Sequence, residues 1–253
     1  MLGGPLFSSS AVPLPEPEGS PVPKEMSEED IAEVMQDFAN AAKNAIEAGF
    51  DGVEIHGANG YLPDQFLQDT CNRRTDRWGG SIENRARFHI ELTRKVAEAI
   101  GADKTGMRLS PYSDWQGMLM DDPDPSFRYV IEQLKPMGLA YLHLIEARIR
   151  GNDDVDPGDQ SVRWIVEEWD NASPVLIAGG FTPESARRAV DEVYQRFDVV
   201  IVFGRYFVAN PDLVFKVKAG VELVKYERTY FYTPGITKGY IDYPFSPEYL
   251  SAH

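Results

Sequence analysis

Apolar residues recur along this chain at two spacings, which together predict helices and strands in regular succession. From Ile31 to Ile46 they recur every three or four positions, which indicates a helix with one buried face. Residues 51–56 then form a short apolar run of the kind typical of a buried strand. By the same reasoning helices are predicted at residues 80–100, 125–137, 162–169 and 183–194, and strands at residues 106–110, 141–146, 174–178 and 199–204.

The alternation of strands with helices indicates a parallel sheet joined by right-handed crossovers. The strands read as apolar on both faces, as expected of a sheet covered by helices. The predicted fold class is therefore α/β. A closed (β/α)8 barrel needs eight such strands, whereas the pattern yields five, so a barrel built from this chain would be incomplete.

The two ends of the chain lack a periodic pattern. Residues 1–26 are rich in Gly, Ser and Pro, which predicts an extended arm or a long loop. Ser27 to Asp30 then resembles a capping box, in which the serine oxygen and the later carboxylate satisfy free amides at a helix start. Residues 27–245 are accordingly the predicted barrel domain, and residues 246–253 a C-terminal tail.

Composition and charge exclude several classes of function. The net charge of −15 argues against nucleic-acid binding, because neutralising phosphates requires a basic surface. No apolar run approaches the ~20 residues that span a bilayer, and the start shows no basic-then-apolar leader. Cys71, the only cysteine, cannot form an internal disulfide, so a reducing, cytoplasmic location is expected. With one cysteine and scattered histidines, no metal site is indicated.

The densest chemical signal is His56-Gly57-Ala58-Asn59-Gly60-Tyr61, directly after a predicted strand. Sites in parallel α/β folds are built at the carboxyl ends of strands. His56 and Asn59, three residues apart in a turn, can both donate to one oxygen and so polarise a carbonyl or phenolate. Tyr61 can supply a proton. On position alone, the alternative is a histidine satisfied at a helix start.

Five segments carry a family resemblance: EAGFDGVEIHGANGYLPDQFL, NRRTDRWGGSIENRARF, GMRLSPY, VFGRYFVANPDL and KGYIDYP. In this order, across about residues 20–245, they resemble the old yellow enzyme family of FMN-dependent ene-reductases. The resemblance implies a (β/α)8 TIM barrel that reduces activated C=C bonds with hydride from NAD(P)H, passed through FMN. It also implies that the strands present are the C-terminal five, strands 4–8, of an N-terminally truncated barrel.

Carried over residue by residue, the resemblance assigns roles at the strand ends. His56 and Asn59 resemble the pair that binds the carbonyl oxygen of an enone substrate, and Tyr61 resembles the acid that protonates the carbon α to it. Arg108 matches the arginine placed against the flavin pyrimidine, where a cation stabilises charge on the reduced ring. An ordinary ion pair at the barrel mouth is the alternative for Arg108.

The same resemblance assigns phosphate binding to turns after the last two strands. Gly179 and Gly180, with Gly204 and Arg205, resemble these turns, where barrel enzymes often hold phosphate through backbone amides. Simple turn geometry also explains the glycines. Phe231 and Tyr232 resemble the aromatic tail segment that packs near the flavin. The segment Arg74 to Ser81 is family-typical but reads as structural, a charged loop that leads into a capped helix.

The strands that grip the flavin ring in the family have no counterpart in this sequence, so FMN binding is expected to be weakened. Three interpretations stay open. The chain is a shortened product of an ene-reductase lineage, a working variant whose open side is covered by the arm, a homo-oligomer or a partner chain, or a non-redox descendant. The last would be an enone isomerase or a binding protein, because the same acid and oxyanion groups serve enone isomerisation.

Overall fold

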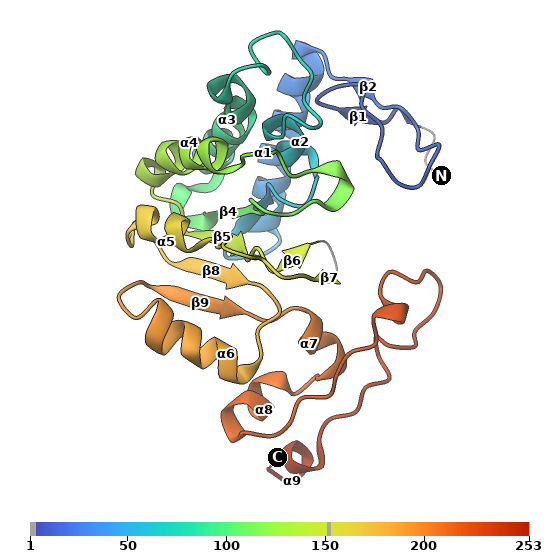
Figure 1. Ribbon diagram of the computed structural model, residues 1–253, viewed down its shortest axis with the longest axis vertical. Coiled ribbons are helices and arrows are strands. Elements are labelled where there is room, and N and C mark those ends of the chain that lie inside the picture. The colour runs from blue at the N-terminus through green and yellow to red at the C-terminus, as the bar shows by residue number, and fades with distance from the viewer. Residues whose placement is uncertain (1–3, 151–152, 253) are drawn as a thin grey trace. The chain divides into compact units, whose positions relative to one another are not determined.

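The computed structural model describes residues 4–150 and 153–252 of the chain, so that residues 1–3 of the predicted arm and His253 of the predicted tail lie outside it. The described residues divide into two compact units (Figure 1). The first comprises residues 4–177, without 151 and 152, together with Arg196–Val200. The second comprises Ala178–Gln195 and residues 201–252. The domain boundaries expected from the sequence stay predictions.

The five predicted strands form one sheet in the order β3-β4-β5-β8-β9. Their bounds are β3 (Val53–His56), β4 (Thr105–Leu109), β5 (Tyr141–Ile145), β8 (Val175–Ala178) and β9 (Val199–Val202). The pairs β3/β4 and β4/β5 are parallel, and their register places His56, Arg108 and His143 in one row across three strands. Among the described residues β3 and β9 are the two edges of this sheet, which therefore does not close into a barrel.

The helices of the first unit follow the predicted pattern closely. They are α1 (Glu28–Glu47), α2 (Leu62–Leu67), α3 (Ile82–Ile100), α4 (Asp124–Leu134) and α5 (Arg163–Trp169). The predicted capping box starts α1, since the Ser27 side chain accepts from the Asp30 amide and the Asp30 carboxylate accepts from the Ser27 amide. Only α2 was not predicted, because its six residues are too few to show a helical period.

The second unit contains α6 (Pro183–Arg188), α7 (Arg205–Ala209), α8 (Leu213–Ala219) and α9 (Pro247–Ala252). The predicted helix at residues 183–194 begins at a capping box of Thr182 with Ser185, and it continues beyond α6 as a π-helix at Ala189–Val193. The buried polar centre of the second unit is Asn210, whose side chain binds the backbone of Val224 and the Lys216 ammonium.

The core of the first unit lies against one face of the sheet. Ile55, Met107 and Leu142 share a row across β3, β4 and β5 and are at most 3% exposed. Phe66 of α2 and Phe88 of α3 stack with ring centroids 4.2 Å apart and are fully buried. This apolar layer fixes α2, and with it the turn that precedes α2, against the sheet.

The opposite face of β3, β4 and β5 carries polar residues, so the expectation that the strands are apolar on both faces was wrong for these three, whereas β8 (VLIA) and β9 (VVIV) are apolar throughout. The register alternates, and it places Glu54, His56, Arg108 and His143 on this second face. A strand of four residues, such as β3, has only two positions on each face. A sequence as short as VEIH therefore cannot separate a polar face from an interrupted apolar run.

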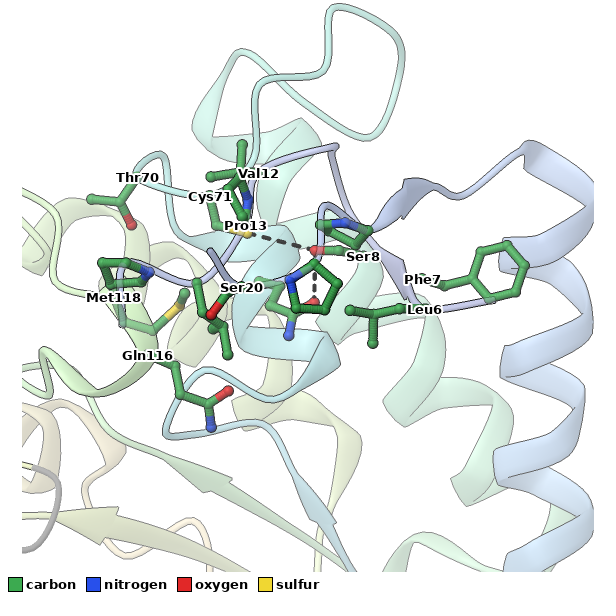
Figure 2. A pocket seen from close by; sticks show the side chains of 16 residues that line it. Leu6, Phe7, Ser8, Val12, Pro13, Ser20, Thr70, Cys71, Gln116 and Met118 are labelled. Atoms are coloured by element: carbon green, nitrogen blue, oxygen red, sulfur yellow. Dashed lines mark hydrogen bonds between the residues drawn. The ribbon is translucent and has the colours of Figure 1, made fainter. Parts of the chain in front are cut away.

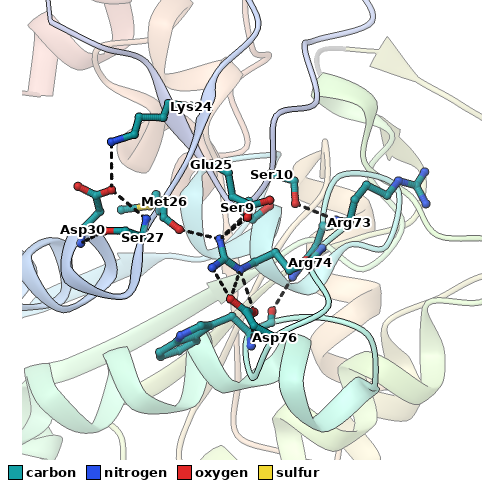
Figure 3. Close-up of polar contacts among 12 residues, drawn as sticks. Ser9, Ser10, Lys24, Glu25, Met26, Ser27, Asp30, Arg73, Arg74 and Asp76 are labelled. Atoms are coloured by element: carbon teal, nitrogen blue, oxygen red, sulfur yellow. Dashed lines mark hydrogen bonds and ion pairs between the residues drawn. The ribbon is translucent and has the colours of Figure 1, made fainter.

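Residues 4–26 belong to the first unit and pack against the rest of it. The arm forms a parallel pair, β1 (Phe7–Ser8) with β2 (Lys24–Glu25), and buries Ser9. Arg74 holds it in place: Nη1 donates to the carbonyls of Ser9 at 3.0 Å and Met26 at 2.7 Å, while Nε donates to Asp76 (Figure 3). The arm is therefore docked by a buried arginine from the loop that the sequence marked as structural. A second short pair, β6 (Ile149–Arg150) with β7 (Asp153–Asp154), is antiparallel.

Candidate active site

The turn from His56 to Tyr61 connects the end of β3 to the start of α2. His56 is the last residue of β3 and Tyr61 is the N-cap of α2. Two consecutive residues, Asn59 with φ 54° and Gly60 with φ 72°, adopt the left-handed conformation that reverses the chain here. Gly60 also meets a spatial limit, because a Cβ on it would lie 2.7 Å from the Cβ of Gln116. The sequence AsnGly thus suits this turn for two physical reasons.

This turn brings His56 and Tyr61 together. Their ring centroids are 4.5 Å apart with an interplanar angle of 39°. Tyr61 is 52% exposed, whereas His56 is half-buried, and the Nδ1 atom of His56 is buried without a hydrogen-bond partner among the described residues. A buried polar atom normally has a hydrogen-bond partner, so an unpartnered imidazole nitrogen beside an exposed phenol marks this turn as a candidate ligand site.

Arg108 lies beside His56 in the sheet and influences its charge. The two residues are register partners on β3 and β4, and both are half-buried. Burial lowers the pKa of His56, the Arg108 guanidinium lowers it further, and Glu54 opposes these effects. His56 is therefore neutral at pH 7, and one of its ring nitrogens is a donor that carries no charge of its own.

A carboxylate next to this pair was not singled out from the sequence. Glu54 Oε2 lies 2.8 Å from His143 Nδ1, which must carry the proton because a carboxylate only accepts. Burial acts to raise the pKa of Glu54, but the His143 hydrogen bond and the charges of His143 and Arg108 outweigh it, so the pKa lies below its usual value. The alternation in VEIH, which puts Glu54 on the same face as His56, is the signal that identifies it.

Gly106 of β4 leaves room for the Tyr141 ring next to Glu54. Glu54, Gly106 and Tyr141 are register partners across β3, β4 and β5. A Cβ on Gly106 would lie 2.5 Å from the Tyr141 ring, so the ring occupies the space that a side chain would fill. Burial and the neighbouring Glu54, to which the hydroxyl donates, raise the pKa of Tyr141 to about 12. Tyr141 thus remains a protonated donor to Glu54.

The residues expected to bind phosphate all lie in the second unit, whereas His56, Asn59, Tyr61 and Arg108 lie in the first. Gly179 and Gly180 directly follow β8, and Gly180 is left-handed with φ 63°. Gly204 follows β9, is the N-cap of α7 and has no heavy atom within 4 Å of where its Cβ would stand. The Arg205 guanidinium lies 5.4 Å from the Tyr226 ring centroid.

These features fit the parts of FMN that the resemblance assigns to them. The open space at Gly204 leaves room for a phosphate to approach the backbone at the start of α7. In the first unit, Arg108 provides a half-buried cation and His56 an unpartnered ring nitrogen. Of the aromatic tail, Phe231 stacks on Tyr226 at 5.5 Å.

Tyr232 is 80% exposed, with a left-handed φ of 57°.

In residues 4–150 and 153–252 no helix is long and apolar enough to cross a membrane. No cluster of three or more His, Cys, Asp or Glu side chains in that part of the chain is arranged to hold a metal ion.

The chain resembles known proteins over almost its whole length. It is 53% identical to the aldehyde reductase FrzD of Cladobotryum sp. over 247 residues, which cover 97% of this chain and 65% of the relative. It is 51% identical over 253 residues to a protein of Claviceps purpurea named "Probable inactive dehydrogenase easA", covering 97% of this chain and 66% of the relative. The chain therefore spans about two thirds, 65–66%, of the length of these relatives.

The fold is matched by a solved barrel. The structure of the old yellow enzyme homologue from Zymomonas mobilis superposes with a TM-score of 0.84 at 32% identity, covering 96% of this chain and 69% of the other. The five-stranded sheet is accordingly an incomplete (β/α)8 barrel, as the sequence predicted. Residues 7–223 match the family described as the NADH:flavin oxidoreductase / NADH oxidase family. The chain therefore belongs to the NADH:flavin oxidoreductase / NADH oxidase family.

Proposed function

We propose that this chain carries the substrate-binding and proton-donating part of an ene-reductase. The reaction is reduction of the activated C=C bond of an α,β-unsaturated carbonyl compound with NAD(P)H, in small-molecule biosynthesis. The observation that carries the proposal is the neutral His56, with a buried and unpartnered Nδ1, against the exposed Tyr61. A neutral donor and a nearby phenol are the groups that the developing enolate of such a reaction requires.

Each side chain of the turn has a distinct role in this proposal. His56 and Asn59 donate to the carbonyl oxygen of the substrate, which makes its β carbon electrophilic. Tyr61 protonates the α carbon, and its exposure leaves the hydroxyl accessible to substrate and to water that restores the proton. The low pKa of His56 favours this division, because a neutral imidazole orients the carbonyl without competing with Tyr61 to protonate it.

FMN, when bound, supplies the hydride that it has received from NAD(P)H. Arg108 would lie against its pyrimidine ring, and Gly179, Gly180, Gly204 and Arg205 would hold its phosphate. Because the chain spans 65–66% of the length of its relatives, we propose that it binds FMN more weakly than they do. A second copy of the chain or a partner chain that covers the open sheet edge would restore affinity. The proposed location is cytoplasmic.

A second candidate is an inactive or non-redox member of the family. The relative from Claviceps purpurea, at 51% identity, is named "Probable inactive dehydrogenase easA", whereas the similarly related protein from Cladobotryum sp. is named an aldehyde reductase. Identity at this level therefore does not separate the two outcomes. Enone isomerisation without a change in flavin absorbance would favour the second candidate, and oxidation of NAD(P)H coupled to enone consumption favours the first.

Phenol binding tests the oxygen site, since a phenolate resembles the developing enolate. His56→Ala should weaken the affinity for phenol by about 10- to 100-fold, as expected when a buried hydrogen bond to a charged oxygen is lost. Calorimetric titration in excess FMN measures this. Tyr61→Phe is the matched control, because it keeps the ring and should leave the affinity within about threefold. Equal affinities for the wild type and His56→Ala would refute the assignment of the oxygen site.

A further inference from the structure

Every backbone polar group of Asn59 and Gly60 is hydrogen-bonded to a side chain. The Asn59 amide donates to Ser110 Oγ at 2.8 Å and the Gly60 amide to Asp64 Oδ2 at 2.9 Å. In return, Gln116 Nε2 donates to the Asn59 carbonyl at 3.1 Å and Gln65 Nε2 to the Gly60 carbonyl at 2.7 Å. These four side chains, which the sequence did not single out, hold the backbone of both residues next to the proton donor.

We call these four side chains (Ser110, Asp64, Gln116 and Gln65) the clamp. The clamp is needed because the conformation of the turn is costly in free energy. A left-handed Asn59 next to a left-handed Gly60 is sparsely populated in an unconstrained chain, and it persists where surrounding contacts over-determine it. The clamp comes from three places, namely α2, the residue that follows β4, and the loop at residues 115–117. Loss of one contact should therefore loosen the turn without unfolding the unit.

Gln65 in turn is held by the arm. Ser8 Oγ donates to Gln65 Oε1 at 2.8 Å, and Ser9 Oγ donates to the Gln65 carbonyl at 2.7 Å. A carboxamide has one accepting and one donating end. With its oxygen bound to the Ser8 hydroxyl, Gln65 must turn its amino group toward the carbonyl of Gly60. Ser8 thus sets the orientation in which Gln65 supports the turn.

A cavity of about 280 Å³ lies between the arm and this clamp. Its lining includes Ser8 and Ser20 of the arm, Gln65 and Gln116 of the clamp, and Cys71, and Figure 2 shows Ser8, Ser20, Cys71 and Gln116 around it. Both glutamines that support the turn carbonyls therefore border the space beneath the arm. Cavity residues are replaceable by side chains of similar size with less strain than residues in a close-packed core.

We propose that Gln65 is a positioning residue for the proton donor Tyr61, and that the arm acts on the catalytic turn through Ser8 and Gln65. The catalytic part of this inference rests on the proposed function, whereas the structural coupling does not. Docking of the arm orders the Gln65 amide, the amide fixes the Gly60 carbonyl, and the fixed turn holds Tyr61 at the start of α2.

Two variants with matched controls test the coupling. Gln65→Met keeps the length of the side chain but removes the donor, and Gln36→Met makes the same change on the exposed surface of α1. Ser8→Ala removes the hydroxyl that orients Gln65, and Ser20→Ala removes an arm hydroxyl that donates to the carbonyl of Pro17, also in the arm. Amide hydrogen exchange of residues 57–61 is measured for all four and for the wild type.

The expected result is faster exchange at Asn59, Gly60 and Tyr61, by roughly 3- to 10-fold in Gln65→Met and roughly 2- to 3-fold in Ser8→Ala. Both controls should match the wild type. In enone reduction, kcat should fall by about 10-fold in Gln65→Met while KM stays nearly constant, because proton transfer depends on the position of Tyr61 more than substrate binding does.

Wild-type exchange rates in a folded Gln65→Met would overturn the proposal, as would equal acceleration in Gln36→Met. If Gln65→Met does not fold, Ser8→Ala decides in the same way, since unchanged exchange relative to Ser20→Ala contradicts the coupling. A wild-type chain without enone turnover would count against the proposed function alone. The exchange rates would still confirm or refute the role of Gln65.

Discussion

Tyr61→Phe should lower the rate of enone reduction by about 10²–10⁴-fold, the usual contribution of a general acid. The substitution removes the hydroxyl but keeps the ring that packs 4.5 Å from His56, so the turn and the oxygen site stay in place. The loss should appear in kcat, because the proton is needed after the carbonyl has been bound. Steady-state oxidation of NADPH with a cyclic enone, in excess FMN, measures it.

A companion reaction separates proton donation from other defects. Reduction of the flavin by NADPH precedes the step that uses Tyr61, so stopped-flow flavin reduction should be unchanged in Tyr61→Phe. Where the chain alone turns over too slowly, a polypeptide that supplies the remaining third of a relative is added to wild type and variant alike. Equal enone turnover by the two proteins would remove Tyr61 from the mechanism.

His89→Gln should change how the stability of the protein depends on pH. His89 lies fully buried on α3, with Nε2 3.3 Å from the Gly57 carbonyl, and burial lowers its pKa from 6.5 to about 4. In the unfolded chain His89 therefore binds a proton below about pH 6.5, whereas in the folded chain it binds one only below about pH 4. The stability linked to His89 is present above pH 6.5, and about 3 kcal/mol of it is lost as the pH falls to 4.

Asp64 produces the opposite dependence. Burial raises the pKa of this fully buried carboxyl group from 3.8 to about 6, against its hydrogen bonds with Gly60 and Gln68. The folded chain thus binds the proton more tightly, and the linked stability increases by about 3 kcal/mol as the pH falls from 6 to 4. In the wild type the two contributions nearly cancel over this range.

The difference in unfolding free energy between His89→Gln and the wild type isolates the histidine. Glutamine can still donate to the Gly57 carbonyl but does not titrate. The variant should therefore gain about 3 kcal/mol relative to the wild type between pH 7 and pH 4, because the loss of stability linked to His89 is absent from the variant and every other contribution is common to both proteins. Urea denaturation at half-unit pH steps gives both curves. Parallel curves would show that His89 is not kept neutral by burial.

The elements that could be predicted from the sequence are those with a long periodic run of apolar residues and a defined start. The helix that begins at Ser27 has a full capping box and a buried face of nearly six turns, and it was predicted to within two residues. The strand positions followed from their place between such helices. The candidate turn was singled out because His56 ends a strand and Asn59 and Tyr61 follow it directly, where parallel folds build their sites, and its role as an active site stays a prediction.

What the sequence did not reveal depends on contacts between distant segments. Ser8 and Gln65 are 57 positions apart, and no local pattern connects them. Arg74 read as part of a self-contained loop, yet it also binds carbonyls of the arm that lie 48 and 65 positions away. Glu54 and His143 meet only through the register of three strands. Such pairs arise from tertiary packing, which propensity and periodicity do not encode.

Titration of FMN with this chain, followed by quenching of flavin fluorescence, shows whether the chain retains part of a flavin site next to an intact proton donor. We expect saturable quenching with an affinity below that of the longer Cladobotryum reductase measured in parallel. Arg108→Ala should lower the affinity further, while Arg77→Ala, on an exposed loop, should leave it unchanged. The absence of quenching at the highest concentrations would show that the chain does not bind FMN. Quenching that Arg108→Ala leaves unaltered would show that Arg108 is not part of a flavin site.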